Sequence, residues 1–185
     1  MKNGFPAEKV RNGSVLAVKT HEWGPSGRSG YHRAVLLIRQ PAGAILAEFN
    51  RQSGGHIGVA GLDRFQLKQG RLWRQFVRSE LTAWRALNLD WLANFTGPTH
   101  VVVYEDLVTD TEAVLRAALA FLELKVPDRQ LDCALRRKEG IYRRRKRNLP
   151  PGFDPYTPDM KAAIATVEES VMSRVRQFMA LAAPG

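Results

Sequence analysis

The sequence predicts an α/β fold in which helices flank a parallel sheet. Three short apolar runs, residues 14–18, 34–38 and 100–104, have the length and composition of buried strands. The second and third runs are each followed by a helical pattern, and such alternation of strands and helices is typical of a parallel sheet. At 185 residues the chain is long enough to bury a core, and residues 1–185 are assigned to one domain.

The first half of the chain contains two of these strands. Ser14–Val18 is continuous in apolar residues, which predicts a strand, whereas residues 21–31 hold three glycines and a proline and are predicted to form a loop. Ala34–Ile38 is the second predicted strand. Pro41 suits the first turn of the helix that follows.

The second half continues the same alternation after a glycine-rich loop at 53–61. A long amphipathic helix comes next, with apolar residues mostly three or four positions apart: Leu72, Phe76, Trp84, Leu87, Trp91, Leu92 and Phe95. His100–Tyr104 is the third predicted strand, and Thr109–Glu112 is a capping box that opens another helix. Further helices are predicted at Asp128–Arg136 and from Pro158 onward.

Three strands are few for a sheet covered by helices on both faces. We therefore expect the domain to be partial, with a first strand and its phosphate-binding loop outside this chain. The glycines at 54–61 do not supply such a loop, because they follow a helix and no Gly-Lys-Ser or Gly-Lys-Thr occurs in the sequence. Cys133, the only cysteine, lies in an apolar pattern and is predicted to be a core residue.

The net charge of +10 is concentrated in one segment. Eight basic residues and one acid, Glu139, lie between Arg136 and Arg147, which favours a local anionic ligand over a broad basic face. The segment can clamp a phosphate around Gly140, bind nucleic acid or act as a nuclear localisation run. Tyr142 is the only aromatic residue in the segment, whereas a nucleic-acid surface interleaves several aromatics with its basic residues, so no nucleic-acid partner is expected.

Polar groups follow each predicted strand, at the edge where open α/β sheets bind their ligands. Lys19, Thr20 and His21 follow the first strand, and His21 is suited to take a proton from a hydroxyl near neutral pH. The Arg39 guanidinium after the second strand has the geometry for a phosphate. The Tyr104 ring after the third strand can stack on a base. No spacing of His, Cys, Asp or Glu typical of metal ligands is present. The sequence therefore predicts group transfer from an anionic nucleotide without a metal.

Four of these segments occur in the order found in sulfotransferases that use 3′-phosphoadenosine 5′-phosphosulfate (PAPS). Lys19-Thr20-His21 resembles their Lys-Thr-His segment, and Arg39-Gln40-Pro41 is similar to their Arg-Asn-Pro motif. The stretch 104–107 resembles their Tyr-Glu-Asp-Leu strand end, and 137–140 their late Arg-Lys-Gly segment. Across nearly the whole chain, the sequence looks closest to the sulfotransferase region of WSC-domain-containing proteins.

The resemblance implies a P-loop-NTPase-like sheet and transfer of a sulfuryl group from PAPS to an acceptor hydroxyl on a carbohydrate. It implies that His21 is the general base and that Lys19 stabilises charge on the transferring group. Arg39, Arg137, Lys138 and Gly140 would hold the 3′-phosphate of the cofactor, and Tyr104 would contact its adenine. Relatives of this type are anchored in the Golgi lumen, so membrane contact is expected only through a segment absent from this chain.

The chain departs from the family pattern in three places, one of which is the insertion of Glu139 into the late Arg-Lys-Gly motif. The loop that holds the 5′-phosphosulfate would precede Lys2, so we expect this chain alone to be impaired in transfer. Ala47 stands where the family usually has a serine that contacts the phosphate. Two alternatives remain, a nucleotide-dependent kinase of related fold and a basic module that binds nucleic acid or sulfated glycan through 143–147.

Overall fold

The computed structural model of the chain describes Val10, residues 12–139 and residues 150–182. Within them, two parallel strands form a small sheet, β1 (Ala34–Ile38) and β2 (Thr99–Val103). The pairing runs from Ala34 opposite Thr99 to Ile38 opposite Val103, so both strands end at the same edge. The mixed α/β class and the parallel sheet are confirmed, and β1 has the predicted bounds.

The predicted strand at Ser14–Val18 is wrong. This segment is irregular, Leu16 keeps 74% of its surface exposed, and the Ser14 amide and hydroxyl both donate to the side-chain oxygen of Asn12. A short apolar run becomes a strand only where a neighbouring edge pairs with its backbone. In the described residues β1 pairs with β2 alone, so the sheet there has two strands where the sequence predicts three.

Three helices connect the two strands: α2 (Pro41–Gly54), α3 (Leu62–Gln66) and α4 (Arg71–Asn94). The predicted helix at Pro41 and the long amphipathic helix are confirmed. The sequence predicts one long helix after the loop at 53–61, whereas the structure has two helices there, the short α3 and the long α4, separated by residues 67–70. Another helical turn, α1 (Gly24–Arg28), lies inside the predicted loop at 21–31, which is therefore wrong at that place.

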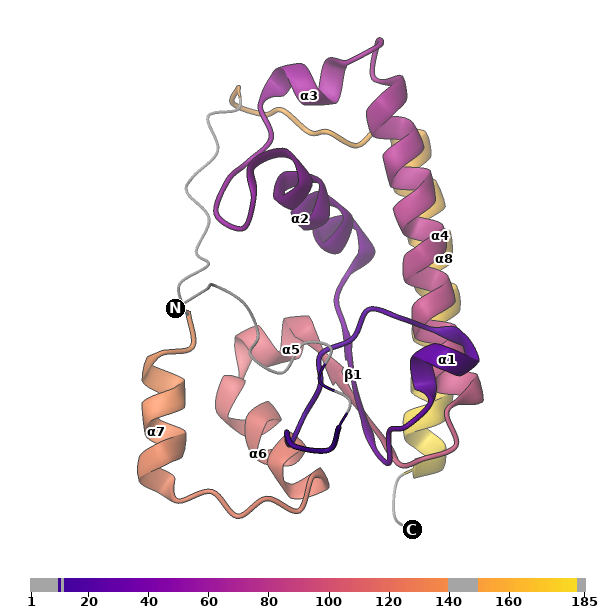
Figure 1. The fold of residues 1–185 in the computed structure, drawn as a ribbon. Coiled ribbons are helices and arrows are strands. Elements are labelled where there is room, and N and C mark those ends of the chain that lie inside the picture. Colours follow the sequence, from indigo (N-terminus) through magenta and orange to yellow (C-terminus); the bar gives the residue numbers. More distant parts are fainter. Residues whose placement is uncertain (1–9, 11, 140–149, 183–185) are drawn as a thin grey trace.

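The two longest helices, α4 and α8 (Pro158–Ala182), lie side by side (Figure 1). Both helices contribute side chains to each of the two hydrophobic clusters of the described residues. At their N-terminal halves, a cluster rich in aromatic residues includes Phe49, Phe65, Trp73, Val77, Met160 and Ile164. Towards their C-terminal ends, a second cluster packs against the sheet and includes Leu36, Ile38, Trp91, Val171 and Val175. The two helices therefore run in the same direction and cover one face of the sheet.

Three further helices follow β2: α5 (Tyr104–Thr109), α6 (Thr111–Phe121) and α7 (Asp128–Arg136). The third predicted strand is shifted by one residue, because Tyr104 begins α5. The helix predicted after the capping box is confirmed, but its cap is Asp110, which accepts a bond from the Ala113 amide. Thr109 is still part of α5 and its hydroxyl donates to Glu105 instead.

Helix α7 has the predicted bounds but not the predicted burial. Leu131 is its buried residue, whereas Cys133 is exposed, so the prediction of a core cysteine is wrong. The apolar pattern around Cys133 was too short to show which side of a nine-residue helix faces the protein.

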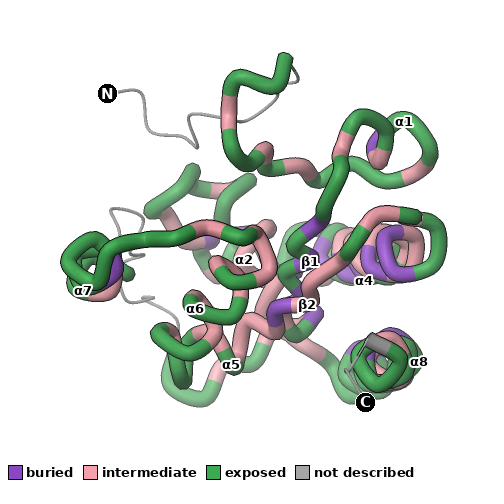
Figure 2. Tube along the Cα trace, turned by 90° about the horizontal axis from the view of Figure 1, so that it is seen from below, coloured by how far each residue is buried: buried purple, intermediate pink, exposed green. Residues whose placement is uncertain are grey.

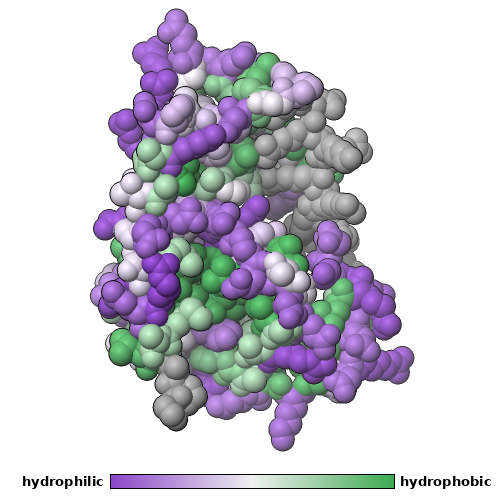
Figure 3. Space-filling model, turned by 180° about the vertical axis from the view of Figure 1, so that it is seen from behind, coloured by the Kyte–Doolittle hydropathy of each residue, from purple (hydrophilic) through white to green (hydrophobic). Residues whose placement is uncertain are grey.

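Burial is uneven across the sheet. Ala34, Leu36 and Ile38 face the long helices, whereas Val35 and Leu37 on the opposite face of β1 remain 43% and 54% exposed (Figure 2). From behind, hydrophobic side chains gather in the lower half of the molecule, the half that holds the sheet (Figure 3). Among the helices described, none combines the length and apolar character that crossing a membrane requires.

We expect the stability of the fold to depend on pH through His100. Its ring stacks on Phe121 of α6, with centroids 5.3 Å apart, and burial lowers its pKa. The unfolded chain therefore binds the proton more readily, so stability is retained above about pH 6.5 and is lost as pH falls below it. Urea unfolding at pH 7.5 and 5.5 should show a loss of unfolding free energy at the lower pH in the wild type and a smaller loss in His100→Phe. An equal loss in the two proteins would contradict the role of His100.

Candidate functional site

The structure brings two predicted site residues, Arg39 and Tyr104, into contact. Each directly follows a strand, and because Ile38 and Val103 are paired, the two side chains leave neighbouring strands at the same edge. The guanidinium carbon of Arg39 lies 4.5 Å from the centroid of the Tyr104 ring. This distance is that of a cation–π interaction, which holds the cation over the aromatic face.

The backbone around Arg39 is fixed from two helices. The Trp84 indole of α4 donates to the Arg39 carbonyl at 3.1 Å, and the Gln40 amide donates to the Glu105 carboxylate of α5 at 3.1 Å. The Arg39 side chain lies across the first turn of α2, where a Cβ atom at Gly43 would come within 3.3 Å of its Nε. Glycine at position 43 therefore makes room for the guanidinium.

The chemistry of this pair suits an anionic group that lies next to an aromatic surface. Arg39 is half-buried, and within the described residues no carboxylate forms an ion pair with its guanidinium. Its donors are then available for an anionic group, while the α2 N-terminus beside it adds a favourable dipole. Tyr104 offers a ring of the kind on which a planar base can stack.

Lys19 and His21 lie outside the sheet, in the segment that precedes α1. Both are exposed, in an irregular segment where the Thr20 hydroxyl accepts a bond from the Glu22 amide at 3.0 Å. His21 is close enough to Glu48 to contribute to lowering the pKa of that carboxyl, after the larger effect of the Arg51 hydrogen bond. Glu48 is about 10 Å along the helix from Pro41 at 1.5 Å per residue. Because residues 14–18 form no strand, the expectation that two strand ends deliver His21 and Arg39 to one crevice loses its structural basis, and no contact within the described residues joins the two side chains.

A second carboxylate, Glu80 of α4, interacts electrostatically with Glu48 and Arg51 of α2. Burial raises its pKa, and the like charge of Glu48 raises it further, while Arg51 opposes the shift. The sequence analysis missed Glu48 and Glu80, since nothing in their local pattern shows that α2 and α4 face each other at this point.

We expect Glu80→Gln to stabilise the protein more at pH 7 than at pH 4. Because the pKa of Glu80 is raised in the folded state, the protonated carboxyl stabilises the fold at pH values below the ordinary pKa of 4.5. This stabilisation is lost as the pH rises through the folded pKa, and glutamine, which carries no charge, avoids that loss. Urea unfolding at both pH values measures the difference. Asp132→Asn, at an exposed position of α7, is the control. A gain that is equal at both pH values, or larger at pH 4, would contradict the assignment.

The late basic residues are not brought to Arg39 by any recorded contact in the described chain. Arg137 follows α7 and is exposed, and the Lys138 ammonium donates to the Thr111 hydroxyl at the start of α6, at 3.3 Å. Gly140 and the run 143–147 lie outside the described residues. Within the described part, no group of three His, Cys, Asp or Glu side chains is arranged to hold a metal ion.

The chain is similar to curated proteins named WSCD family members. It is 54% identical over 178 residues to one from Aedes aegypti, which covers 96% of this chain and 56% of that protein. Relatives from Drosophila pseudoobscura pseudoobscura and Drosophila melanogaster are 53% and 52% identical, over 94% and 89% of this chain and 54% and 51% of their own lengths. The chain spans about half the length of these relatives. No family model and no solved structure matches it.

Proposed function

We propose that this chain, a relative of the WSCD family members, forms the cofactor 3′-phosphate side and the acceptor side of a PAPS-dependent sulfotransferase. The observation that carries the proposal is the contact between Arg39 and Tyr104 at the ends of two parallel strands. A guanidinium and an aromatic ring at this edge fit a nucleotide that carries an extra phosphate. The order of the motifs along the sequence supports the same family.

In the proposed reaction, the oxygen of an acceptor hydroxyl attacks the sulfur of PAPS. The bond between sulfur and the bridging phosphate oxygen breaks, and adenosine 3′,5′-bisphosphate leaves. His21 takes the hydroxyl proton and Lys19 stabilises the negative charge that spreads over the transferring group. Arg39 holds the 3′-phosphate and Tyr104 the adenine, with Arg137, Lys138 and Gly140 assigned to the phosphate by family resemblance.

This division of roles requires no contact between His21 and Arg39. In PAPS the 3′-phosphate is carried on C3′ of the ribose and the transferred sulfuryl group on the 5′-phosphate, so a base and a 3′-phosphate ligand need not touch. We propose a carbohydrate hydroxyl as the acceptor and the Golgi lumen as the compartment, both by family resemblance.

Thermal unfolding with adenosine 3′,5′-bisphosphate tests the proposal, with 5′-AMP and ADP as matched controls. A compound that binds only the folded state adds about 2.7 kcal/mol at 100 times its dissociation constant, which raises Tm by about 5–10 °C for a domain of this size. A shift specific to the bisphosphate is expected. An equal shift with ADP would favour the kinase alternative, and no shift with any of the three would contradict the proposed site.

A further inference from the structure

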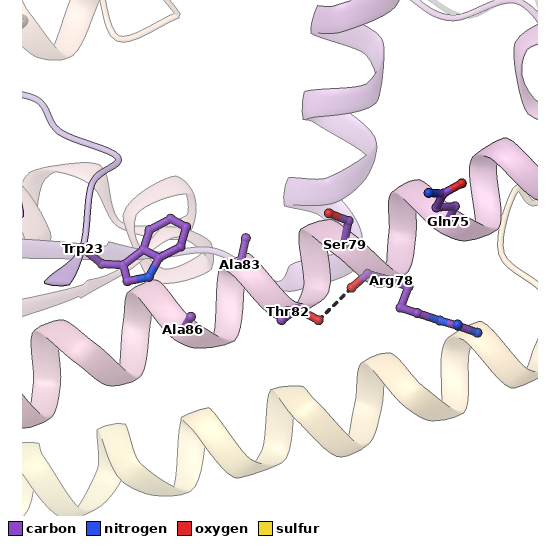
Figure 4. Close-up of a pocket in the computed structure, with 7 residues that line it drawn as sticks. All are labelled: Trp23, Gln75, Arg78, Ser79, Thr82, Ala83 and Ala86. Atoms are coloured by element: carbon purple, nitrogen blue, oxygen red, sulfur yellow. Dashed lines mark hydrogen bonds between the residues drawn. The ribbon is translucent and has the colours of Figure 1, made fainter.

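A hollow of about 420 Å³ lies along α4, close to the segment that carries His21 (Figure 4). Trp23 stands at one end and Gln75 and Arg78 at the other. Between them the lining side chains are small: Ser79, Thr82, Ala83 and Ala86. The hollow exists because these four residues are neighbours on one face of α4 and have short side chains, whereas the residues at either end of the hollow have long ones.

The segment that carries Trp23 is anchored on α4. The Trp91 indole donates to the Glu22 carbonyl at 3.0 Å, and the Gly24 amide donates to the Asp90 carboxylate at 2.8 Å. Arg28 forms an ion pair with the same carboxylate at 2.8 Å, with both side chains largely buried. The residues on either side of Trp23 are thus fixed, while the indole itself remains 45% exposed.

The groups in this hollow match the chemistry of a sugar ring. One face of a pyranose presents C–H groups that pack on an aromatic ring, and its edge presents hydroxyls that need donors and acceptors. Trp23 supplies the aromatic surface, and Ser79, Gln75 and Arg78 supply polar groups. The Arg78 guanidinium has no ion pair among the described residues, and the Thr82 hydroxyl is turned to the Arg78 carbonyl at 3.0 Å.

The position of Trp23 connects the hollow to the proposed reaction. Trp23 is two residues after His21, so their Cα atoms are at most about 7 Å apart. A sugar next to the one that reacts at His21 therefore lies within reach of the Trp23 end of the hollow.

From this arrangement we infer that the hollow is the acceptor-binding subsite, with a pyranose ring of an oligosaccharide stacked on Trp23. Ser79, Gln75 and Arg78 lie further along α4 and hydrogen-bond hydroxyl groups of the following sugar units of the same oligosaccharide. Trp23 is then a specificity-determining residue that places the acceptor chain so that the neighbouring hydroxyl reaches His21. The inference rests on the proposed function for the identity of the acceptor.

Iodide quenching of tryptophan fluorescence tests the inference, since Trp23 is more exposed than Trp73 and Trp91, which are buried, and Trp84, which is half-buried. The probes are a neutral hexasaccharide, N-acetylchitohexaose, and an acidic one prepared from heparin. Saturable protection of Trp23 by at least one probe is expected, and the two arms distinguish a neutral from an acidic acceptor. No protection by either would overturn the inference.

Variants give the test a second readout. Trp23→Ala should weaken binding of the protecting hexasaccharide by about tenfold or more, and Trp23→Phe should retain part of it. Ser79→Phe, which fills the hollow without changing Trp23, should weaken binding as well. Leu16→Ala, an exposed apolar residue outside the lining, is the matched control. Wild-type affinity in Trp23→Ala would overturn the inference.

The bisphosphate titration separates the two proposals. If Trp23→Ala keeps the thermal shift with adenosine 3′,5′-bisphosphate but loses the hexasaccharide, both proposals are supported. If wild type shows the bisphosphate shift and no hexasaccharide binding, the acceptor subsite alone is wrong. If wild type shows no bisphosphate shift, the proposed function has failed whatever the saccharides do.

Discussion

Replacing Arg39 with alanine is expected to abolish most of the stabilisation by adenosine 3′,5′-bisphosphate. Hydrogen bonds to a charged group contribute about 1.5–3 kcal/mol, so its dissociation constant should rise by about 10- to 150-fold. The fold should survive, because the bond from Trp84 goes to the backbone carbonyl of residue 39 and does not need the side chain. Calorimetric titration measures the affinity directly.

Two further variants make this result specific. Arg39→Lys keeps the charge but loses the planar fork, so an intermediate loss of affinity is expected. Arg174→Ala removes one positive charge from an exposed position on α8 and should leave the affinity unchanged. If Arg174→Ala weakens binding as much as Arg39→Ala, the effect is one of net charge and the site is not at Arg39.

Replacing Trp73 with alanine is expected to cause a large loss of stability. Its ring lies 4.7 Å from that of Phe49 and 5.1 Å from that of Phe65, at the centre of the aromatic cluster. Its indole also donates to the Pro155 carbonyl at 2.6 Å, which ties the segment before α8 to α4. Removing a buried tryptophan typically costs about 3–5 kcal/mol, and urea unfolding measures it.

Trp73→Phe separates the two contributions. It keeps most of the ring packing and loses the bond to Pro155, so a smaller loss of stability than in the alanine variant is expected. The segment matters for the site as well, because the Tyr156 hydroxyl donates to the Ala42 carbonyl in the first turn of α2 at 2.7 Å. Equal losses in both variants would show that ring packing contributes little.

The elements that the sequence predicted well are those with a strong local signal. β1 and α7 have the predicted bounds, and α8 begins at its predicted proline. Ser14–Val18 failed because an apolar run of that length does not reveal whether a neighbouring strand is there to pair with it. Likewise, the continuous apolar run of β1 predicts burial on both faces, but the helices cover only one.

The sequence singles out Arg39 and Tyr104 as candidate site residues but does not show their contact. The two residues are candidates because each stands at the end of an apolar run, whereas their contact depends on the register of the two strands, which the sequence alone does not fix. Gly43 and Glu105 were missed because their roles arise only when α2 and α5 meet at the sheet edge. Trp23 was missed because the other residues that line the hollow beside it lie on α4, about fifty or more positions further along the chain.

The measurement that tests the central claim most directly is a crystal structure of the chain with adenosine 3′,5′-bisphosphate. The 3′-phosphate is expected within hydrogen-bond distance of the Arg39 guanidinium, with the adenine close to the Tyr104 ring. Binding of the bisphosphate elsewhere, with the Arg39–Tyr104 pair unchanged and in contact with water alone, would contradict the account.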